Sequence, residues 1–115
     1  MSDSEKEFTR LIKIMEKLRG QGGCPWDRKQ THKTLLPYLL EETYELIEAI
    51  DKNDKNMMME EIGDLLLQIV FHSQIMKEET KNGIEKVIKN LNDKLIRRHP
   101  HVFSDKKGLY KDYHV

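Results

Sequence analysis

The sequence predicts an all-α protein, a four-helix bundle with short connections. Four segments place apolar residues three and four positions apart, which is the period of an amphipathic helix. No segment alternates polar and apolar residues over a useful length, as a half-buried strand would. Glycine, proline and short polar runs separate the segments, and no connection is long enough to divide the 115 residues into two domains. We therefore expect one helical domain at 1–103 and a short C-terminal tail at 104–115.

The first helix is predicted to start at a cap, Asp3 or Ser4, and to stop at Gly20. Its apolar positions recur at helical steps: Phe8, Leu11, Ile12, Met15 and Leu18. The following segment, 20–27, contains three glycines and a proline and is predicted to be a loop. An indole in such a loop, here Trp26, normally needs a surface to cover.

The second helix should start near Thr34, because Pro37 is tolerated only in a first turn. A polar turn at 51–56 should end it. Its expected apolar stripe is Leu36, Leu39, Leu40, Thr43, Ile47 and Ile50.

A third helix is predicted from about Met57 to about Glu79. Gly83 separates it from a fourth helix, which Pro100 ends. The apolar residues of the fourth helix are in clean helical register: Ile84, Val87, Ile88, Leu91 and Leu95.

Charged residues make up 35% of the chain, yet its formal net charge is zero. This composition suits a soluble helical protein and argues against a nucleic-acid binder with a dominant basic field. The single cysteine, Cys24, cannot form an internal disulfide, so a reducing compartment is the simplest setting. No signal peptide is visible, and no stretch approaches the ~20 apolar residues of a membrane span. We expect a cytoplasmic protein, with neither a membrane nor a nucleic-acid polymer as its partner.

Three glutamates lie close together on the second helix: Glu41, Glu42 and Glu45. At about 100° per residue they fall opposite the apolar stripe, so a solvated face would explain them. Like charges three or four residues apart are nevertheless mildly destabilising, and no lysine or arginine lies between positions 35 and 51 to offset them. The second helix alone is therefore consistent with two interpretations of these glutamates, a solvated helix face and a cation site.

The third helix favours the cation site, because its acids interrupt an otherwise apolar surface that is typical of a buried helix. One narrow polar stripe runs along it: Glu61, Asp64, Gln68 and His72. Acids flanked by core residues cost free energy when they have no partner, and no lysine or arginine lies between positions 57 and 76. The counter-charge must come from elsewhere in the fold or from a metal ion.

Antiparallel packing of the second and third helices would bring the two acidic sets face to face. Without a cation, converging carboxylates repel one another and their pKa values rise. Oxygen-only ligands favour Mg²⁺, Mn²⁺ or Ca²⁺ over zinc, which prefers histidine and cysteine. A di-iron bundle, the nearest competitor, expects a Glu-x-x-His motif, but Ile69 stands three residues before His72.

Two further groups are candidate substrate contacts. Lys94, Arg97 and Arg98 share part of a helix face and could neutralise phosphate oxygens. Basic residues at a helix C-terminus are also favoured by the helix dipole, so ordinary decoration is the alternative. Trp26 and Lys29 could offer a nucleotide a stacking surface and a charge, unless the indole simply anchors the loop.

Four motifs in this order resemble those of the MazG family: CPWDRKQTH at 24–32, YLLEETYE at 38–45, EIGDLLLQ at 61–68 and RRHPHVF at 97–103. The resemblance implies a helical bundle, assembled as a homodimer or a dimer of dimers. It also implies cleavage of NTP or dNTP to NMP and pyrophosphate with Mg²⁺, for which Mn²⁺ could substitute. Longer members of the family carry a second, related domain, whereas this chain has one.

The resemblance also assigns roles to single acids. The implied metal ligands are Glu42, Glu45, Glu61 and Asp64. Glu41 would assist, through a second metal or by orienting the water, and either Glu41 or Glu42 would take a proton from the attacking water. Charge and aromatic stacking suggest as substrate contacts Trp26, Lys29, Lys94, Arg97 and Arg98. The alternatives are a non-catalytic helical interaction module and a metal-binding regulatory bundle on the same scaffold.

Overall fold

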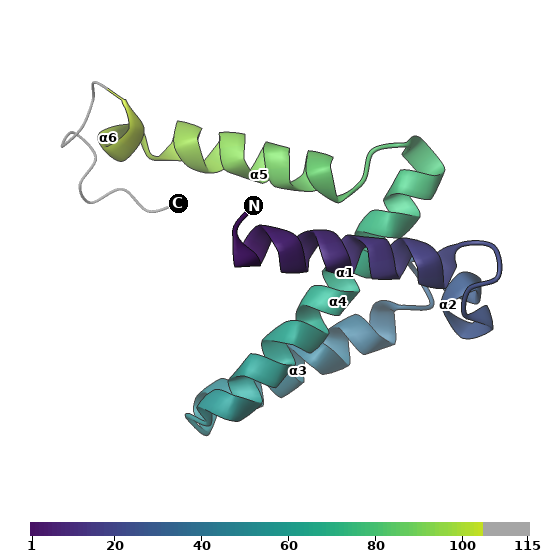
Figure 1. Ribbon diagram of the computed structural model, residues 1–115. Helices are drawn as coiled ribbons and strands as arrows, with labels where there is room; N and C mark the ends of the chain where they lie inside the picture. The colour runs from purple at the N-terminus through teal and green to yellow at the C-terminus, as the bar shows by residue number, and fades with distance from the viewer. Residues whose placement is uncertain (105–115) are drawn as a thin grey trace.

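The computed structural model describes residues 1–104, which form six helices and contain no strand (Figure 1). The helices are α1 (Asp3–Arg19), α2 (Pro25–Lys29), α3 (Leu36–Asp51), α4 (Lys55–Thr80), α5 (Ile84–Arg98) and α6 (Pro100–Phe103). The predicted all-α fold is confirmed, and each of the four predicted long helices is present. Apart from Ser104, the predicted tail lies outside the described residues. No described helix is both long and apolar enough to cross a membrane.

The N-terminal cap of α1 is Ser2, so the predicted cap, Asp3 or Ser4, was wrong. The Ser2 hydroxyl oxygen accepts a hydrogen bond from the backbone N–H of Glu5 (3.2 Å), and a Glu5 carboxylate oxygen accepts one from the N–H of Ser2 (3.3 Å). This reciprocal capping box favours Ser2, because a glutamate stands three residues after it. Gly20 ends the helix, as predicted.

The segment predicted to be a loop contains the start of a short helix, α2. Pro25 lies in its first turn, where backbone N–H groups have no partner within the helix, so the proline costs no helical hydrogen bond. The chain reaches α2 through Gly22, whose φ of 77° favours glycine, and through the N–H of Cys24, which donates to the carbonyl of Leu18 (2.9 Å). Five residues are too few to show a periodic apolar pattern, which is why the sequence did not reveal α2.

Helices α3 and α4 form an antiparallel hairpin, the most extensive helix pair in the structure (Figure 1). The turn at 52–54 includes Asn53, which has a φ of 52°, and Asp54, which caps α4. An Asp54 carboxylate oxygen accepts a hydrogen bond from the N–H of Met57 (3.1 Å). So short a connection sets the register between the two helices locally.

Helix α4 is the central element, because α1, α3 and α5 each pack against it. The buried hydrophobic core draws on α1, on the segment before α3 and on the C-terminal half of α4: Met15, Leu35, Val70, Phe71 and Ile75. The core therefore holds α1 and the start of α3 to one end of the hairpin, and the rest of the hairpin projects beyond it (Figure 1).

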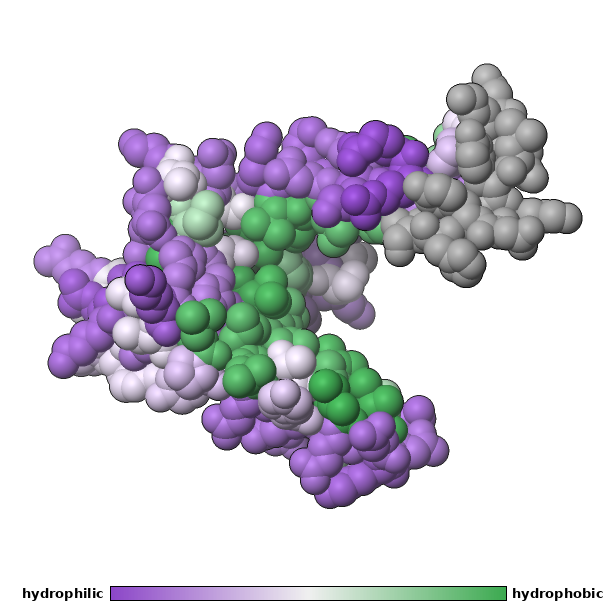
Figure 2. All heavy atoms as spheres, turned by 180° about the vertical axis from the view of Figure 1, so that it is seen from behind, coloured by the Kyte–Doolittle hydropathy of each residue, from purple (hydrophilic) through white to green (hydrophobic). Residues whose placement is uncertain are grey.

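Much apolar surface stays exposed within one chain. No residue of α5 is buried, and the apolar face of this helix is open at Val87, Leu91 and Leu95. Figure 2 shows hydrophobic side chains gathered in a band on this side of the molecule. On α4, Gly63 faces open space, because a methyl group built there meets no atom of residues 1–104 within 4 Å beyond its chain neighbours and its own helix backbone. The long helices thus present faces that a second surface could cover.

Candidate functional site

Three of the predicted acids converge between the two helices of the hairpin. Glu42 and Glu45 lie on α3, and Glu61 lies on α4. One carboxylate oxygen from each lies within 4.8 Å of the other two, and all three side chains are half-buried. The antiparallel packing that the sequence predicted is therefore what brings the two acidic sets together.

The orientation of α3 differs from the prediction. The sequence placed Glu42 and Glu45 on a solvated face opposite the apolar stripe, but the stripe residues Leu36, Leu40 and Ile47 are exposed. Glu42 and Glu45 instead lie on the side that packs against α4. The helical period gives the angle between two sets of residues on a helix. It does not say which set packs against the other helices of the chain and which set stays exposed.

The three carboxylates are in an unfavourable electrostatic environment. The Oε2 atoms of Glu42 and Glu61 are buried and have no hydrogen-bond partner, and within residues 1–104 none of the three glutamates forms an ion pair. Burial, followed by the charge of Glu45, raises the pKa of Glu61 to about 7. The same two causes raise the pKa of Glu42 above its ordinary value. A positive charge is the missing component of this site.

The other two predicted acids flank this group of three. Asp64 is half-buried, and its charge contributes to the raised pKa values of both Glu42 and Glu61. Glu41 is exposed, and its charge contributes to the raised pKa of Glu42. All five acids therefore belong to one region, and Glu41 lies at its solvent-exposed edge.

The residues present fit a hard divalent cation. Every candidate ligand is a carboxylate oxygen, and two of these oxygens are buried without a partner. Magnesium, manganese and calcium ions prefer such ligands, whereas zinc prefers nitrogen and sulfur. Among residues 1–104 no arginine or lysine pairs with these glutamates, which distinguishes this cluster from a structural salt-bridge network.

Trp26 and Lys29, two predicted substrate contacts, lie on α2. The exposed Trp26 ring meets the ring of Tyr38 edge-on, with centroids 5.7 Å apart and an interplanar angle of 81°. Tyr38 was not predicted as a site residue. It lies four residues before Glu42 and seven before Glu45, so all three share one face of α3. That spacing was the signal in the sequence that could have identified Tyr38.

The three basic residues on α5 are not brought to the acids within one chain. Lys94, Arg97 and Arg98 are all exposed. Among the described helices, α5 packs only against α4 and α6, and it follows the end of α4 that is remote from the hairpin turn (Figure 1). A role for these residues at the acidic site requires that another copy of the chain supply them.

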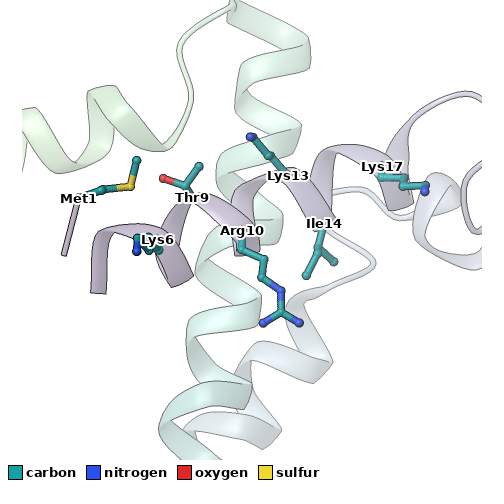
Figure 3. A pocket seen from close by; sticks show the side chains of 7 residues that line it. All are labelled: Met1, Lys6, Thr9, Arg10, Lys13, Ile14 and Lys17. Atoms are coloured by element: carbon teal, nitrogen blue, oxygen red, sulfur yellow. The ribbon is translucent and has the colours of Figure 1, made fainter. Parts of the chain in front are cut away.

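A separate hollow of about 450 Å³ lies on α1 and is distinct from the acidic site (Figure 3). It is lined by Met1, Lys6, Thr9, Arg10, Lys13, Ile14 and Lys17. The four cations recur at helical spacing along one face, and none of the seven described lining residues is acidic. This surface is therefore a basic helix face.

Residues 30–103 match the family model of the MazG nucleotide pyrophosphohydrolase domain. The chain is 62% identical over 107 residues to the nucleoside triphosphate pyrophosphohydrolase/pyrophosphatase MazG of Thermotoga maritima, covering 92% of this chain and 42% of that protein. It is 47% identical over 100 residues to the nucleoside triphosphate pyrophosphohydrolase of Escherichia coli strain K12, covering 86% of this chain and 38% of that protein. The chain thus spans about two fifths of the length of these curated relatives.

A solved structure supports the same relationship. The crystal structure of a mazG-related protein from Thermotoga maritima aligns with a TM-score of 0.71 at 33% sequence identity, covering 84% of this chain and 83% of that one. Sequence and fold agree, and the matched segment contains all five acids of the site. The chain therefore belongs to the MazG nucleotide pyrophosphohydrolase domain family.

Proposed function

We propose that this domain hydrolyses nucleoside triphosphates, NTP or dNTP, to the monophosphate and pyrophosphate, using Mg²⁺ or, in its place, Mn²⁺. The observation that carries the proposal is the convergence of Glu42, Glu45 and Glu61, with two buried oxygens that have no partner. The printed names of the curated relatives support the substrate class. In this reaction water adds to phosphorus, the anhydride bond between the α- and β-phosphates breaks, and pyrophosphate leaves.

The proposed role of each acid follows from its exposure to solvent: the half-buried acids bind the metal ion, and the exposed one accepts a proton. Glu42, Glu45, Glu61 and Asp64 would hold Mg²⁺. When bound, the ion offsets the charge of the phosphate oxygens and lowers the pKa of bound water. Glu41 is at the exposed rim and is free to accept a proton from the attacking water, with Glu42 as the alternative base.

The nucleotide would lie along α3. Tyr38 shares a face with Glu42 and Glu45, and Trp26 extends the aromatic surface of Tyr38. An aromatic surface one helical turn from the acids would let a base stack while the phosphates reach the cation. Lys29, at the end of α2, would add a positive charge beside the base and sugar.

A second copy of the chain would complete the site. The exposed apolar face of α5 has no covering partner among residues 1–104. Its basic end, Lys94, Arg97 and Arg98, complements the unneutralised acids of the hairpin in charge. We therefore expect a homodimer, or a dimer of dimers, in which these cations bind the pyrophosphate at the partner's acidic site.

The test is a panel of common and modified NTPs and dNTPs with analysis of both products. Release of NMP and pyrophosphate is expected, whereas orthophosphate with NDP, or no turnover by a folded protein, would refute the proposal. Glu61→Gln should abolish turnover and keep the fold. Glu60→Gln is the matched control, because Glu60 is the exposed neighbour outside the cluster, and its activity should stay within about twofold of the wild type.

A further inference from the structure

Two histidines from distant parts of the sequence meet outside the acidic site. His32 precedes α3, and His72 lies on α4. Their Nδ1 atoms are 2.8 Å apart, and their ring planes differ by only 5°. The ring centroids are 5.0 Å apart, close to the nitrogen–nitrogen distance plus the two ring radii, so the rings meet edge to edge in one plane. On the other side of His32, its Nε2 atom lies 2.7 Å from a carboxylate oxygen of Glu79.

These contacts determine the tautomer of each neutral ring. The Glu79 carboxylate can only accept, so Nε2 of His32 carries a hydrogen and its Nδ1 is a bare acceptor. His72 must then donate from Nδ1, which leaves its own Nε2 without a hydrogen. That Nε2 atom is buried and has no partner, which a bare nitrogen tolerates better than an N–H group would.

The pair holds the segment that starts α3. His32 is three residues before Leu35, which is fully buried and is the N-cap of α3. The N–H of Leu35 donates to the carbonyl of Thr31 (3.2 Å), and the N–H of Leu39 donates to the carbonyl of Leu35 (3.0 Å). The side chains of Tyr38, Glu42 and Glu45 follow on this helix, so the position of its first turn sets theirs.

We propose that His32 and His72 are positioning residues that fasten the first turn of α3 to α4, and that the pair releases this turn when both rings become protonated. One added proton can be accommodated, because a charged ring still donates to a neutral one across the same contact. A second proton places two N–H groups and two positive charges against each other, so the rings must separate.

The surrounding charges decide how the pair takes up protons. Arg19 on α1 and Glu78 on α4 are bound to each other, and the exposed Lys33 makes no ion pair among the described residues. Glu79, the remaining charged group beside the pair, contacts Nε2 of His32 through a carboxylate oxygen (2.7 Å). Burial, and then the charge of His32, lower the pKa of His72.

The direction of the pH effect follows from that lowered pKa. The unfolded chain takes up a proton at His72 more readily than the folded protein, because an unperturbed histidine has a pKa of about 6.5. The contribution of the pair is therefore complete above that pH and is lost as the pH falls below it.

The experiment measures amide hydrogen exchange, expressed as protection factors, for Leu35 and Leu39 between pH 7.5 and 5.0. In the wild type we expect protection to fall by about tenfold, the equivalent of one net hydrogen bond. His32→Ala should have the lower protection already at pH 7.5. His32→Asn should keep protection at both pH values, because an amide can turn its oxygen or its nitrogen to His72 and does not titrate.

Lys33→Gln is the matched control, since it removes a charge next to the pair without touching either ring, and it should behave as the wild type. Protection in the wild type that does not change with pH while the helices persist by circular dichroism would overturn the proposal. So would a pH-dependent loss in His32→Asn equal to that of the wild type.

The link to activity rests on the proposed function. If the wild type turns over nucleotide, the acid side of its kcat profile should move to lower pH in His32→Asn, with KM within about twofold. An unchanged profile would reject the positioning role alone. Absence of turnover in the wild type at pH 8 would reject the proposed function, and the exchange experiment would still decide the role of the histidine pair.

Discussion

Arg19, the last residue of α1, binds Glu78 of α4 through two hydrogen bonds, from Nε to Oε2 (2.8 Å) and from Nη2 to Oε1 (2.7 Å). Its remaining nitrogen, Nη1, donates to the carbonyls of Asp27 (2.6 Å) and Gln30 (3.0 Å). The guanidinium also lies over the ring of Phe71, 5.6 Å from its centroid. One nearly buried side chain therefore joins α1, α2 and α4.

Arg19→Lys should destabilise the protein by about 1–3 kcal/mol, because lysine keeps the charge but cannot make the paired bonds to Glu78 or reach both carbonyls. Thermal or chemical denaturation measures the loss. Arg10→Lys is the control, since Arg10 pairs with Glu7 on the exposed face of α1 and should cost no more than about 0.5 kcal/mol. Equal losses in the two variants would show that the Arg19 contacts contribute no more than a surface ion pair.

Mg²⁺ should stabilise the folded protein. At a hundred times its dissociation constant, one ion adds about 2.7 kcal/mol to the free energy of unfolding. A thermal melt at increasing Mg²⁺ concentration measures this effect, with Glu60→Gln expected to follow the wild type. Glu61→Gln should lose most of the stabilisation, because it removes one of the three converging carboxylates. A wild-type melting temperature that does not change at millimolar Mg²⁺ would count against a preformed metal site.

Without metal, the acidic site should make the protein less stable as the pH rises. The pKa of Glu61 is about 7 in the folded protein, above its ordinary value near 4.5, so the folded state holds this proton more tightly than the unfolded chain. Stability from this group is therefore present below about pH 4.5 and is lost progressively up to about pH 7. Denaturation in EDTA at pH 5.5 and pH 8 measures the slope.

Glu61→Gln should remove that part of the slope and leave the contributions of the other titrating groups in place. In the metal-free state at pH 8, the glutamine variant should be the more stable protein, because a charge that repels Glu42 and Glu45 is gone. If the two proteins respond identically to pH, Glu61 does not hold its proton in the folded state.

The apolar face of α5 should govern assembly. Leu91→Glu places a charge in the middle of that exposed face, and the variant should run as a single chain of 13.7 kDa in light scattering, whereas the wild type should show at least twice that mass. Lys86→Glu adds an acid on the opposite, polar side of the helix and should assemble normally. A wild type that stays monomeric at high concentration would refute the proposed dimer.

Local signals in the sequence predicted local structure well. Pro37 was correctly placed in the first turn of α3, and Gly20 at the end of α1. The need of the α4 acids for a counter-charge stays a prediction, and Glu61 is half-buried with a carboxylate oxygen that has no partner among residues 1–104. For Pro37 and Gly20 the deciding interaction lies within a few residues along the chain.

Long-range pairings could not be predicted in the same way. Arg19 and Glu78 are separated by 59 positions, and no periodicity links two charges at that distance. The same holds for His32, which lies in the first motif, and His72, which was assigned to the polar stripe of the third helix. The apolar stripe of α3, including Leu40, is exposed in this chain, although apolar residues are expected inside a protein. The proposed assembly would cover it.

Gly63 lies inside α4 on an exposed surface of the helix. Whether a substitution there stabilises or weakens the protein would show whether another molecule covers this surface. A glycine inside a helix costs roughly 0.5–1 kcal/mol relative to alanine, and no described residue fills the place of the missing methyl group. For the chain alone, Gly63→Ala should therefore be stabilising. If that substitution instead weakens assembly or nucleotide binding, the added methyl group collides with a second copy of the chain or with the nucleotide. The contact with that molecule would then lie at Gly63.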